Sequence, residues 1–146
     1  MIVDNKKNIE GKFIPNVRVF VPNLEGKILL LKRGRGIGKG LWNLPGGKID
    51  LGKSKINSCR DECFEEAGIK VYGLKELTNT EFLPVLGNDI NHYFTYYFRA
   101  SGYSGNIKLN DESSDYDFID YAEISRFSIA FNQDAQMVKY FLGKFN

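Results

Sequence analysis

The sequence predicts an α/β fold of the α+β kind, in which helices pack on a mixed β-sheet. Several segments have the β-branched and apolar content of strands, and two have apolar residues at helical spacing. Their order along the chain is strands, helix, strands, helix, which is typical of one sheet covered by helices. The length of 146 residues fits a single domain over residues 1–146. Polar residues 1–12 are expected to form a flexible tail or an edge.

The first half of the chain contains the clearest strand signals. Residues 16–21 (NVRVFV) alternate as a strand does, whereas the apolar run within residues 24–33 is typical of a strand buried on both faces. Four glycines within residues 34–40 predict a loop. Residues 41–47 are predicted as a short extended piece that ends in a glycine pair.

A helix is predicted from Ser54 to Ala67, with Ser54 as its N-cap and Gly68 as its end. One apolar face is expected to consist of Ile56, Cys59, Cys63 and Ala67. Further strands are predicted at residues 70–77, 80–85, 92–100 and 116–121, and a polar loop at 102–115 with a short strand at 107–109. The last helix is predicted over residues 134–144, capped by Asn132 or Asp134.

Composition restricts the class of protein. The net charge of +2, without a dense basic run, argues against nucleic acid as a partner. Apolar stretches fall short of the ~20 residues of a membrane span, and the N-terminus lacks the apolar segment of a secretory signal. Cys59 and Cys63 lie too close on one helix for a disulfide, so we expect reduced thiols and a cytoplasmic location. The oligomeric state stays open, with a homodimer as one expectation.

Three glutamates gather on one side of the first predicted helix. Glu62 and Glu66 are four residues apart and Glu65 is three from Glu62, so like charges lie on neighbouring rows. One interpretation is a solvated acidic face. The other is a site for Mg²⁺ or Mn²⁺, which prefer oxygen ligands. The glycine pair Gly46–Gly47 favours the cation site, because backbone without side chains can approach a ligand.

The segment from Gly47 to Ile69 resembles the signature of the Nudix hydrolases. That family's pattern is G-x5-E-x7-R-E-U-x-E-E-x-G-U, where U is aliphatic, and its spacing is unbroken here. The preceding Trp42-Asn43-Leu44-Pro45-Gly46-Gly47 also matches the family's entry to this segment. The resemblance covers roughly residues 16–125 and implies an α/β/α sandwich.

By resemblance, Glu62, Glu65, Glu66 and the Gly46 carbonyl are expected to hold Mg²⁺ or Mn²⁺. The family hydrolyses nucleoside diphosphates linked to another moiety, and its general base differs between subfamilies. Here the base is expected to be Glu62 or an acid of a later loop. The loop candidates are Asp111, Glu112 and Asp115, with Glu112 favoured over the other two.

Two positions depart from the family pattern, because Lys53 replaces a glutamate and Asp61 replaces an arginine. The neighbouring glutamates fix the helical frame, so a one-residue shift to Arg60 would turn the side chain about 100° away. Coulomb attraction is unchanged when both signs are exchanged. We therefore hypothesise that Lys53 and Asp61 form a structural latch between loop and helix, with an altered number of metals.

Three further residues are candidates for binding substrate. Arg33 ends a buried strand and Arg35 lies in the glycine-rich loop, so both could bind phosphate bidentately. Solvated loop arginines are the alternative. His92, the sole histidine, is a weaker candidate because it shares a strand face with Phe94 and Tyr96. Trp42 and the two cysteines are expected to belong to the core.

The substrate is the least determined feature. Residues 92–100, 115–124 and 131–142 resemble the GDP-mannose mannosyl hydrolases, which cleave at sugar carbon. Retention of both Glu65 and Glu66 favours attack on phosphorus instead. We expect a pyrophosphohydrolase of a nucleotide sugar or a (d)NTP. The alternative is a catalytically weakened domain that acts as a nucleotide sensor or interaction module, as the changed residues 53 and 61 would allow.

Overall fold

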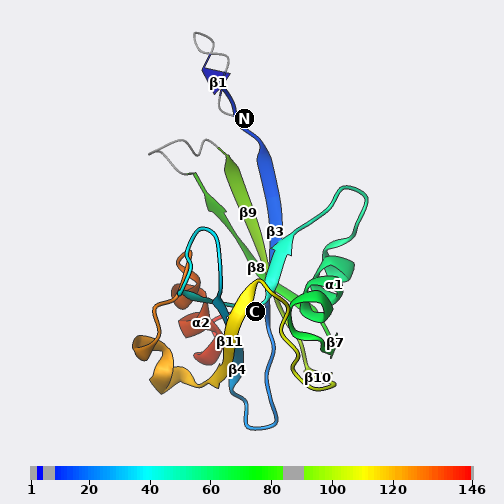
Figure 1. The fold of residues 1–146 in the computed structure, drawn as a ribbon, viewed down its shortest axis with the longest axis vertical. Coiled ribbons are helices and arrows are strands. Elements are labelled where there is room, and N and C mark those ends of the chain that lie inside the picture. Colours follow the sequence, from blue (N-terminus) through cyan, green and yellow to red (C-terminus); the bar gives the residue numbers. More distant parts are fainter. Residues whose placement is uncertain (1–2, 5–8, 84–90, 146) are drawn as a thin grey trace.

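The structure is a computed structural model that describes residues 3–4, 9–83 and 91–145 (Figure 1). Its largest sheet has four strands in the order β6-β3-β9-β8. These strands are β3 (Phe13–Phe20), β6 (Gly46–Lys48), β8 (Lys75–Phe82) and β9 (His92–Arg99). β3 and β9 run parallel, and the other pairs are antiparallel, so the predicted mixed sheet is confirmed.

A second sheet of three strands has the order β11-β4-β5 and lies beside the first (Figure 1). It consists of β4 (Ile28–Arg33), β5 (Trp42–Asn43) and β11 (Ser113–Ile119). Two small antiparallel pairs complete the strands: β1 (Val3–Asp4) with β2 (Ile9–Glu10), and β7 (Lys70–Tyr72) with β10 (Gly102–Ser104).

Helices cover both sides of the sheets, as expected for three layers. The helix α1 (Lys55–Ala67) lies on one side, while the 3-10 helix η1 (Tyr121–Arg126) and α2 (Gln133–Phe141) lie on the other (Figure 1). Each interface has its own apolar core. In β4, Leu29 and Leu31 join the core under α1, whereas Ile28 and Leu30 join the core under α2. This strand is therefore buried on both faces, as its continuous apolar run predicts.

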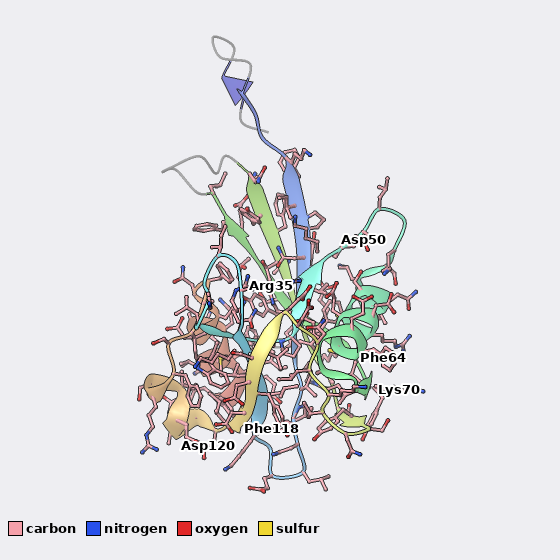
Figure 2. The ribbon with its side chains drawn as sticks, viewed as in Figure 1. Arg35, Asp50, Phe64, Lys70, Phe118 and Asp120 are labelled. Carbon is pink, nitrogen blue, oxygen red and sulfur yellow. The ribbon has the colours of Figure 1, made fainter. Side chains whose placement is uncertain are left out.

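The boundaries of α1 follow its capping residues. The Ser54 hydroxyl accepts a hydrogen bond from the Asn57 backbone N–H at 3.1 Å, and Gly68 ends the helix in the left-handed conformation at φ 70°. The predicted apolar face is wrong at one position, because Ile56 is exposed. Ser58 and Glu66 are buried in α1 together with Cys59, Cys63 and Ala67, and Phe64 points outward (Figure 2).

Several strand boundaries differ from the prediction. A break after Tyr72, where Gly73 adopts φ 66°, separates β7 from β8, which continues to Phe82. The predicted strand at 107–109 is absent, because Ile107 and Leu109 lie in a loop and pack against the core under α1. Residues 84–85 of the predicted strand at 80–85 lie outside the described residues.

The C-terminal region also differs in detail. The helix η1 was not predicted, although Asp120 and Glu123 form a capping box at its start. The final helix begins at Gln133 rather than Asp134, and Asn132 precedes it at φ 57° without a side-chain cap. Within the described part of the chain, no helix is long and apolar enough to cross a membrane.

Candidate active site

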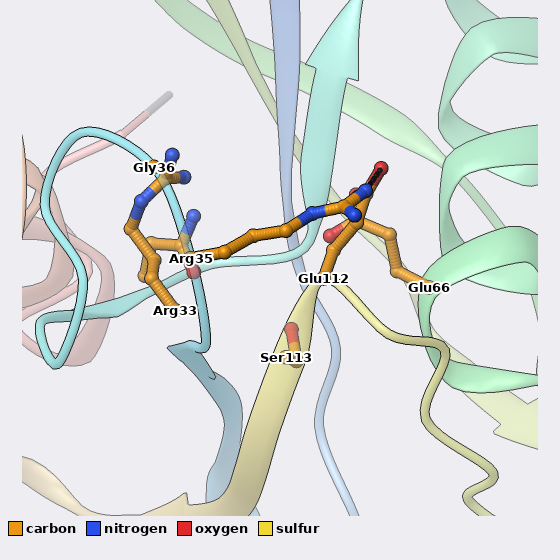
Figure 3. A pocket seen from close by; sticks show the side chains of 7 residues that line it. Arg33, Arg35, Gly36, Glu66, Glu112 and Ser113 are labelled. Atoms are coloured by element: carbon orange, nitrogen blue, oxygen red, sulfur yellow. Dashed lines mark ion pairs between the residues drawn. The ribbon is translucent and has the colours of Figure 1, made fainter.

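A cavity opens between the two sheets and α1, where the glycine-rich loop meets the segment before β11 (Figure 3). Strand β4, its following loop and β5 contribute one wall, α1 contributes a second, and the start of β11 contributes a third. The lining residues are Arg33, Arg35, Gly36, Asn43, Glu66, Glu112 and Ser113. The cavity thus joins an arginine wall to the acidic helix.

Glu66 is the buried carboxyl of this site. Only 7% of the residue is exposed, and one carboxyl oxygen accepts a hydrogen bond from the Gly46 N–H at 3.2 Å. Burial raises the pKa of Glu66 to about 8, against the opposing effect of the Arg18 charge. Burial thus disfavours the charged form of this carboxyl.

Glu62 lies beside Glu66 and is hydrogen-bonded to it. Burial is also the main reason why the pKa of Glu62 is raised. The carboxyl of Glu62 sits against Gly47, since a Cβ at position 47 would lie 2.7 Å from the carboxyl carbon. Glu65 is exposed on the same helix. The structure therefore brings Glu62 and Glu66 together over the glycine pair, with Glu65 at the solvent side.

This donor set fits a hard divalent cation. Carboxylate and carbonyl oxygens are the ligands that Mg²⁺ and Mn²⁺ prefer, and two adjacent carboxyls that share a hydrogen bond are poised to exchange a proton for a metal. Among the described residues, however, no three acidic, histidine or cysteine side chains are already gathered as a metal site. Glu65 would have to turn inward for all three glutamates to bind one ion.

Arg18 of β3 lies beneath the glutamates and was missed by the sequence analysis. Its Nη1 donates to the Leu44 carbonyl oxygen at 2.9 Å. With its amide oriented to satisfy its neighbours, Asn43 accepts from Nη1 of Arg18 at 3.1 Å and from Nη1 of Arg33 at 3.3 Å. Burial lowers the pKa of Arg18, while the nearby Glu66 acts to raise it. One amide oxygen thus holds two guanidinium groups at the cavity.

Arg33 is further fixed by its own loop. Its Nε donates to the Ile37 carbonyl oxygen at 2.8 Å, and its guanidinium carbon lies 5.2 Å from the ring centroid of Phe131. Gly38 packs on the same guanidinium, where a Cβ would lie 3.2 Å from Nε. The glycine-rich loop therefore wraps around Arg33 and orients it toward the cavity.

Arg35 reaches across the cavity toward the acidic loop before β11 (Figure 3). Its Nη1 lies 3.2 Å from Asp111 Oδ2, and its Nη2 lies 3.8 Å from Glu112 Oε1. The backbone links the same loops, because the Gly34 N–H donates to the Glu112 carbonyl oxygen at 2.8 Å. Arg35 and Glu112 consequently share the cavity, and a substrate phosphate would compete with these acids for Arg35.

Lys53 and Asp61 form an ion pair outside the cavity. Lys53 Nζ lies 2.7 Å from Asp61 Oδ2 and 3.7 Å from Asp50 Oδ2, which places an acid of the preceding loop in the same cluster. The hydrogen bond that Lys53 donates to Asp61 is the main reason why the pKa of Lys53 is raised. The pair joins the segment before α1 to the middle of α1.

Two candidate residues lie away from the cavity. His92 Nε2 is 2.7 Å from Glu81 Oε2, and its ring stacks on Phe94 at 4.4 Å between centroids. Asp115 lies within β11, where its carboxyl accepts from the Tyr116 N–H at 2.7 Å. Trp42 packs edge-on against Phe127 at 5.1 Å, in the core under α2. The structure does not bring these side chains to the glutamates.

The residues missed at this site share one signal that could have found them. Arg18 is partly buried and shares a face of β3 with Phe20, which is fully buried, so this face of the strand is covered as well as the face that carries Val17 and Val19. Asn43 and Gln133 are also buried polar residues, at 4% and 2% exposure. Polar residues within apolar strands or helices are normally hydrogen-bonded, and here their partners belong to the site.

Comparison with known proteins identifies the class. The model of the NUDIX domain family matches residues 12–141. A MutT protein from Methanosarcina mazei Go1 is 21% identical, with a TM-score of 0.77 over 93% of this chain and 97% of that chain. A MutT NUDIX hydrolase from Burkholderia pseudomallei is 24% identical, with a TM-score of 0.67 over 73% of this chain and 82% of that chain. Both likenesses show the fold.

A curated relative gives a closer match in sequence. The oxidized purine nucleoside triphosphate hydrolase of Danio rerio is 33% identical over 87 residues, which are 60% of this chain. The aligned part spans about half of that relative, at 54%. The chain thus belongs to the NUDIX domain family, whose model matches most of its length.

Proposed function

We propose that this protein is a metal-dependent hydrolase that cleaves the diphosphate linkage of a nucleoside triphosphate or another nucleoside diphosphate derivative. The observation that carries the proposal is the pair formed by the buried Glu66 and the half-buried Glu62, which lies over the Gly46–Gly47 backbone at a cavity walled by Arg33 and Arg35. Carboxylates for a cation and guanidinium groups for phosphate are the two requirements of this chemistry.

The roles of the chain's own residues follow from their positions. Glu62, Glu65, Glu66 and the Gly46 carbonyl would hold the cation. When bound, a divalent ion offsets the diphosphate charge and lowers the pKa of a water molecule. Arg33, held rigid by its loop, and Arg35, paired only at the cavity surface, would orient the substrate phosphates. Glu112 is proposed as the base that removes a proton from the attacking water, since it lines the same cavity as Glu66.

Similarity favours a purine nucleoside triphosphate among the substrate classes. The relative from Danio rerio is named for hydrolysis of oxidized purine nucleoside triphosphates, and the alignment covers 87 residues. A nucleotide sugar, the other class that the sequence predicts, belongs in the same assay. We propose the triphosphate as the first substrate to test.

A substrate panel with purified protein tests the proposal. We expect release of pyrophosphate or a nucleoside monophosphate from (d)NTPs, including 8-oxo-dGTP, or from nucleotide sugars, in Mg²⁺ or Mn²⁺ and not in EDTA. Glu65→Gln and Glu66→Gln should each lower kcat by at least about a hundredfold, in line with the loss of a charge-stabilising group. Full activity of both variants would contradict the metal assignment.

A ligand sensor is the second candidate function. It is favoured by Lys53 and Asp61, which depart from the family pattern of Gly47 to Ile69. A Nudix domain of NrtR from Shewanella oneidensis, solved with ADP ribose, shares the fold with a TM-score of 0.69 and 19% identity. For a sensor we expect binding of a nucleotide such as ADP-ribose without turnover in either metal. Turnover of any substrate of the panel would favour the hydrolase over the sensor.

A further inference from the structure

We propose that Arg18 is a resident counter-cation for the Glu62–Glu66 pair, which holds the pair in place without metal and opposes metal binding electrostatically. Opposition to metal binding rests on the proposed function, because it requires that a cation binds the glutamates. Holding the pair in place without metal concerns the protein alone. Arg18 lies outside the Gly47–Ile69 segment, on the opposite side of the glycine pair.

Gly46 places Arg18 next to the acids. Position 46 pairs with Arg18 in the β3–β6 register, and its N–H donates to Glu66. A Cβ at position 46 would collide first with the Val17 carbonyl oxygen, and it would also lie 2.9 Å from the Arg18 Cδ, so the arginine stem runs beside the bare face of Gly46. The absence of a side chain therefore lets Arg18 pass over Gly46 while Glu66 binds the same residue from the helix side.

The anchors of Arg18 keep its charge at that position. Its Nη1 is held by the Leu44 carbonyl at 2.9 Å and by the Asn43 amide oxygen at 3.1 Å. These acceptors are neutral, and no ion pair within 4.0 Å joins Arg18 to an acid among the described residues. The positive charge thus acts on Glu62 and Glu66 through space rather than through a direct bond.

The consequence for metal binding follows from charge. A divalent cation bound by the glutamates would place further positive charge close to Arg18. Like charges repel more strongly where the surroundings are partly desolvated. Arg18 therefore stabilises the metal-free site and weakens metal binding. A substrate diphosphate, which is negative, would be attracted by Arg18, Arg33 and the metal together.

Metal affinity in the absence of substrate tests this role. Titration calorimetry with Mn²⁺ alone should show about three- to tenfold tighter binding to Arg18→Met than to the wild type, as expected for a removed like charge. Arg18→Lys keeps the charge but loses the planar fork, so its affinity should stay near the wild-type value. Arg126→Met removes an exposed arginine elsewhere and serves as the net-charge control. Mn²⁺ binding to Arg18→Met that is no tighter than binding to Arg18→Lys would overturn the proposal.

Thermal unfolding in EDTA tests the metal-free role. Arg18→Met should lower Tm in the wild-type background and lower it less when Glu62 and Glu66 are both glutamine. An equal loss in both backgrounds would mean that Arg18 only packs and hydrogen-bonds there, and would refute the counter-cation. Arg18→Gln, which keeps a donor for Leu44, provides the same comparison if Arg18→Met does not fold. These measurements need no turnover, so they can fail independently of the proposed hydrolysis.

Discussion

Gly47 lies against the carboxyl of Glu62, in the space that the Cβ of any other residue would need. A Cβ there would meet the Glu62 carboxyl at 2.7 Å, which is closer than real Cβ contacts allow. We expect Gly47→Ala to displace the Glu62 carboxyl and to cost about 1 kcal/mol of stability, at the low end for overpacking, because the carboxyl ends a flexible side chain. The affinity for Mn²⁺ should also fall, because Glu62 is one of the proposed ligands. Thermal unfolding and Mn²⁺ calorimetry measure both effects.

Glu62→Ser serves as the control background, because it removes the carboxyl that a Cβ at position 47 would meet. In EDTA, Gly47→Ala should lower Tm less in a Glu62→Ser background, because the carboxyl that it strikes is absent. An identical Tm loss in the two backgrounds would assign the effect to the backbone of β6 instead.

The Lys53–Asp61 ion pair permits a charge-exchange test. Lys53→Glu alone places a third acid beside Asp50 and Asp61, and Asp61→Arg alone sets two cations together, so each should lower Tm and change Mg²⁺ affinity. The double variant restores opposite charges and should lie closer to the wild type than either single variant. Thermal unfolding at low and high salt measures this, since screening weakens exposed pairs. Additive effects of the two substitutions would refute the latch.

For single residues, the sequence predicts the role of those within a motif better than the role of those outside it. The spacing of Glu62, Glu65 and Glu66 led to the acidic site because a helix repeats every 3.6 residues. Arg18 was not predicted, because its role depends on a strand register with Gly46 that is set by tertiary pairing. His92 shows the converse, since a lone histidine can be satisfied by a partner such as Glu81.

Among the elements, α1 links the apolar core to the acidic site. Cys59 and Cys63 are fully buried on its inner face. Burial raises the pKa of Cys59 to about 12 and that of Cys63 well above its ordinary value. Because the thiolate is the reactive form, we expect neither thiol to react with Ellman's reagent at pH 8 in the native protein.

Denatured protein supplies the reference for this measurement, and two thiols should titrate there within seconds. Rapid reaction of one thiol in the native state would show that the inner face of α1 opens readily. Slow reaction at the rate of global unfolding is the expected behaviour of a core helix.

The elements were predicted with uneven success, for physical reasons. Capping chemistry fixed both ends of α1, since Ser54 and Gly68 act locally. Strand β8 was divided in the prediction, which left out Thr78 and Asn79, because these residues are held in the strand by pairing with β9, a partner distant in sequence. The loop at 107–109 has the residues of a strand, and its apolar side chains pack on the core without a strand partner.

The whole molecule relies on contacts between its layers, which local pattern does not reveal. The three layers themselves were predictable from the order of strands and helices. The contact between α2 and the segment before Gly46 was not predictable from that order. Gln133, the first residue of α2, is 2% exposed, and its Oε1 accepts a hydrogen bond from the Leu44 N–H at 2.7 Å. Leu44 lies two residues before Gly46 and also accepts from Arg18. One amide of α2 thus supports the segment before Gly46 from the layer opposite α1, and the glutamates of α1 pack on that glycine from the other side.

Gln133→Leu should therefore affect both stability and activity. It leaves the buried Leu44 N–H without an acceptor, which typically costs about 1–3 kcal/mol. Gln136→Leu is a matched control on the same helix. The buried Gln136 Oε1 has no hydrogen-bond partner among the residues that the structure describes, so its loss should be neutral or stabilising. Denaturant unfolding gives the free energies, and kcat in Mg²⁺ gives the effect on the site. Loss of stability in Gln133→Leu with unchanged kcat and Mn²⁺ affinity would show that the α2 layer supports the fold but does not position Gly46.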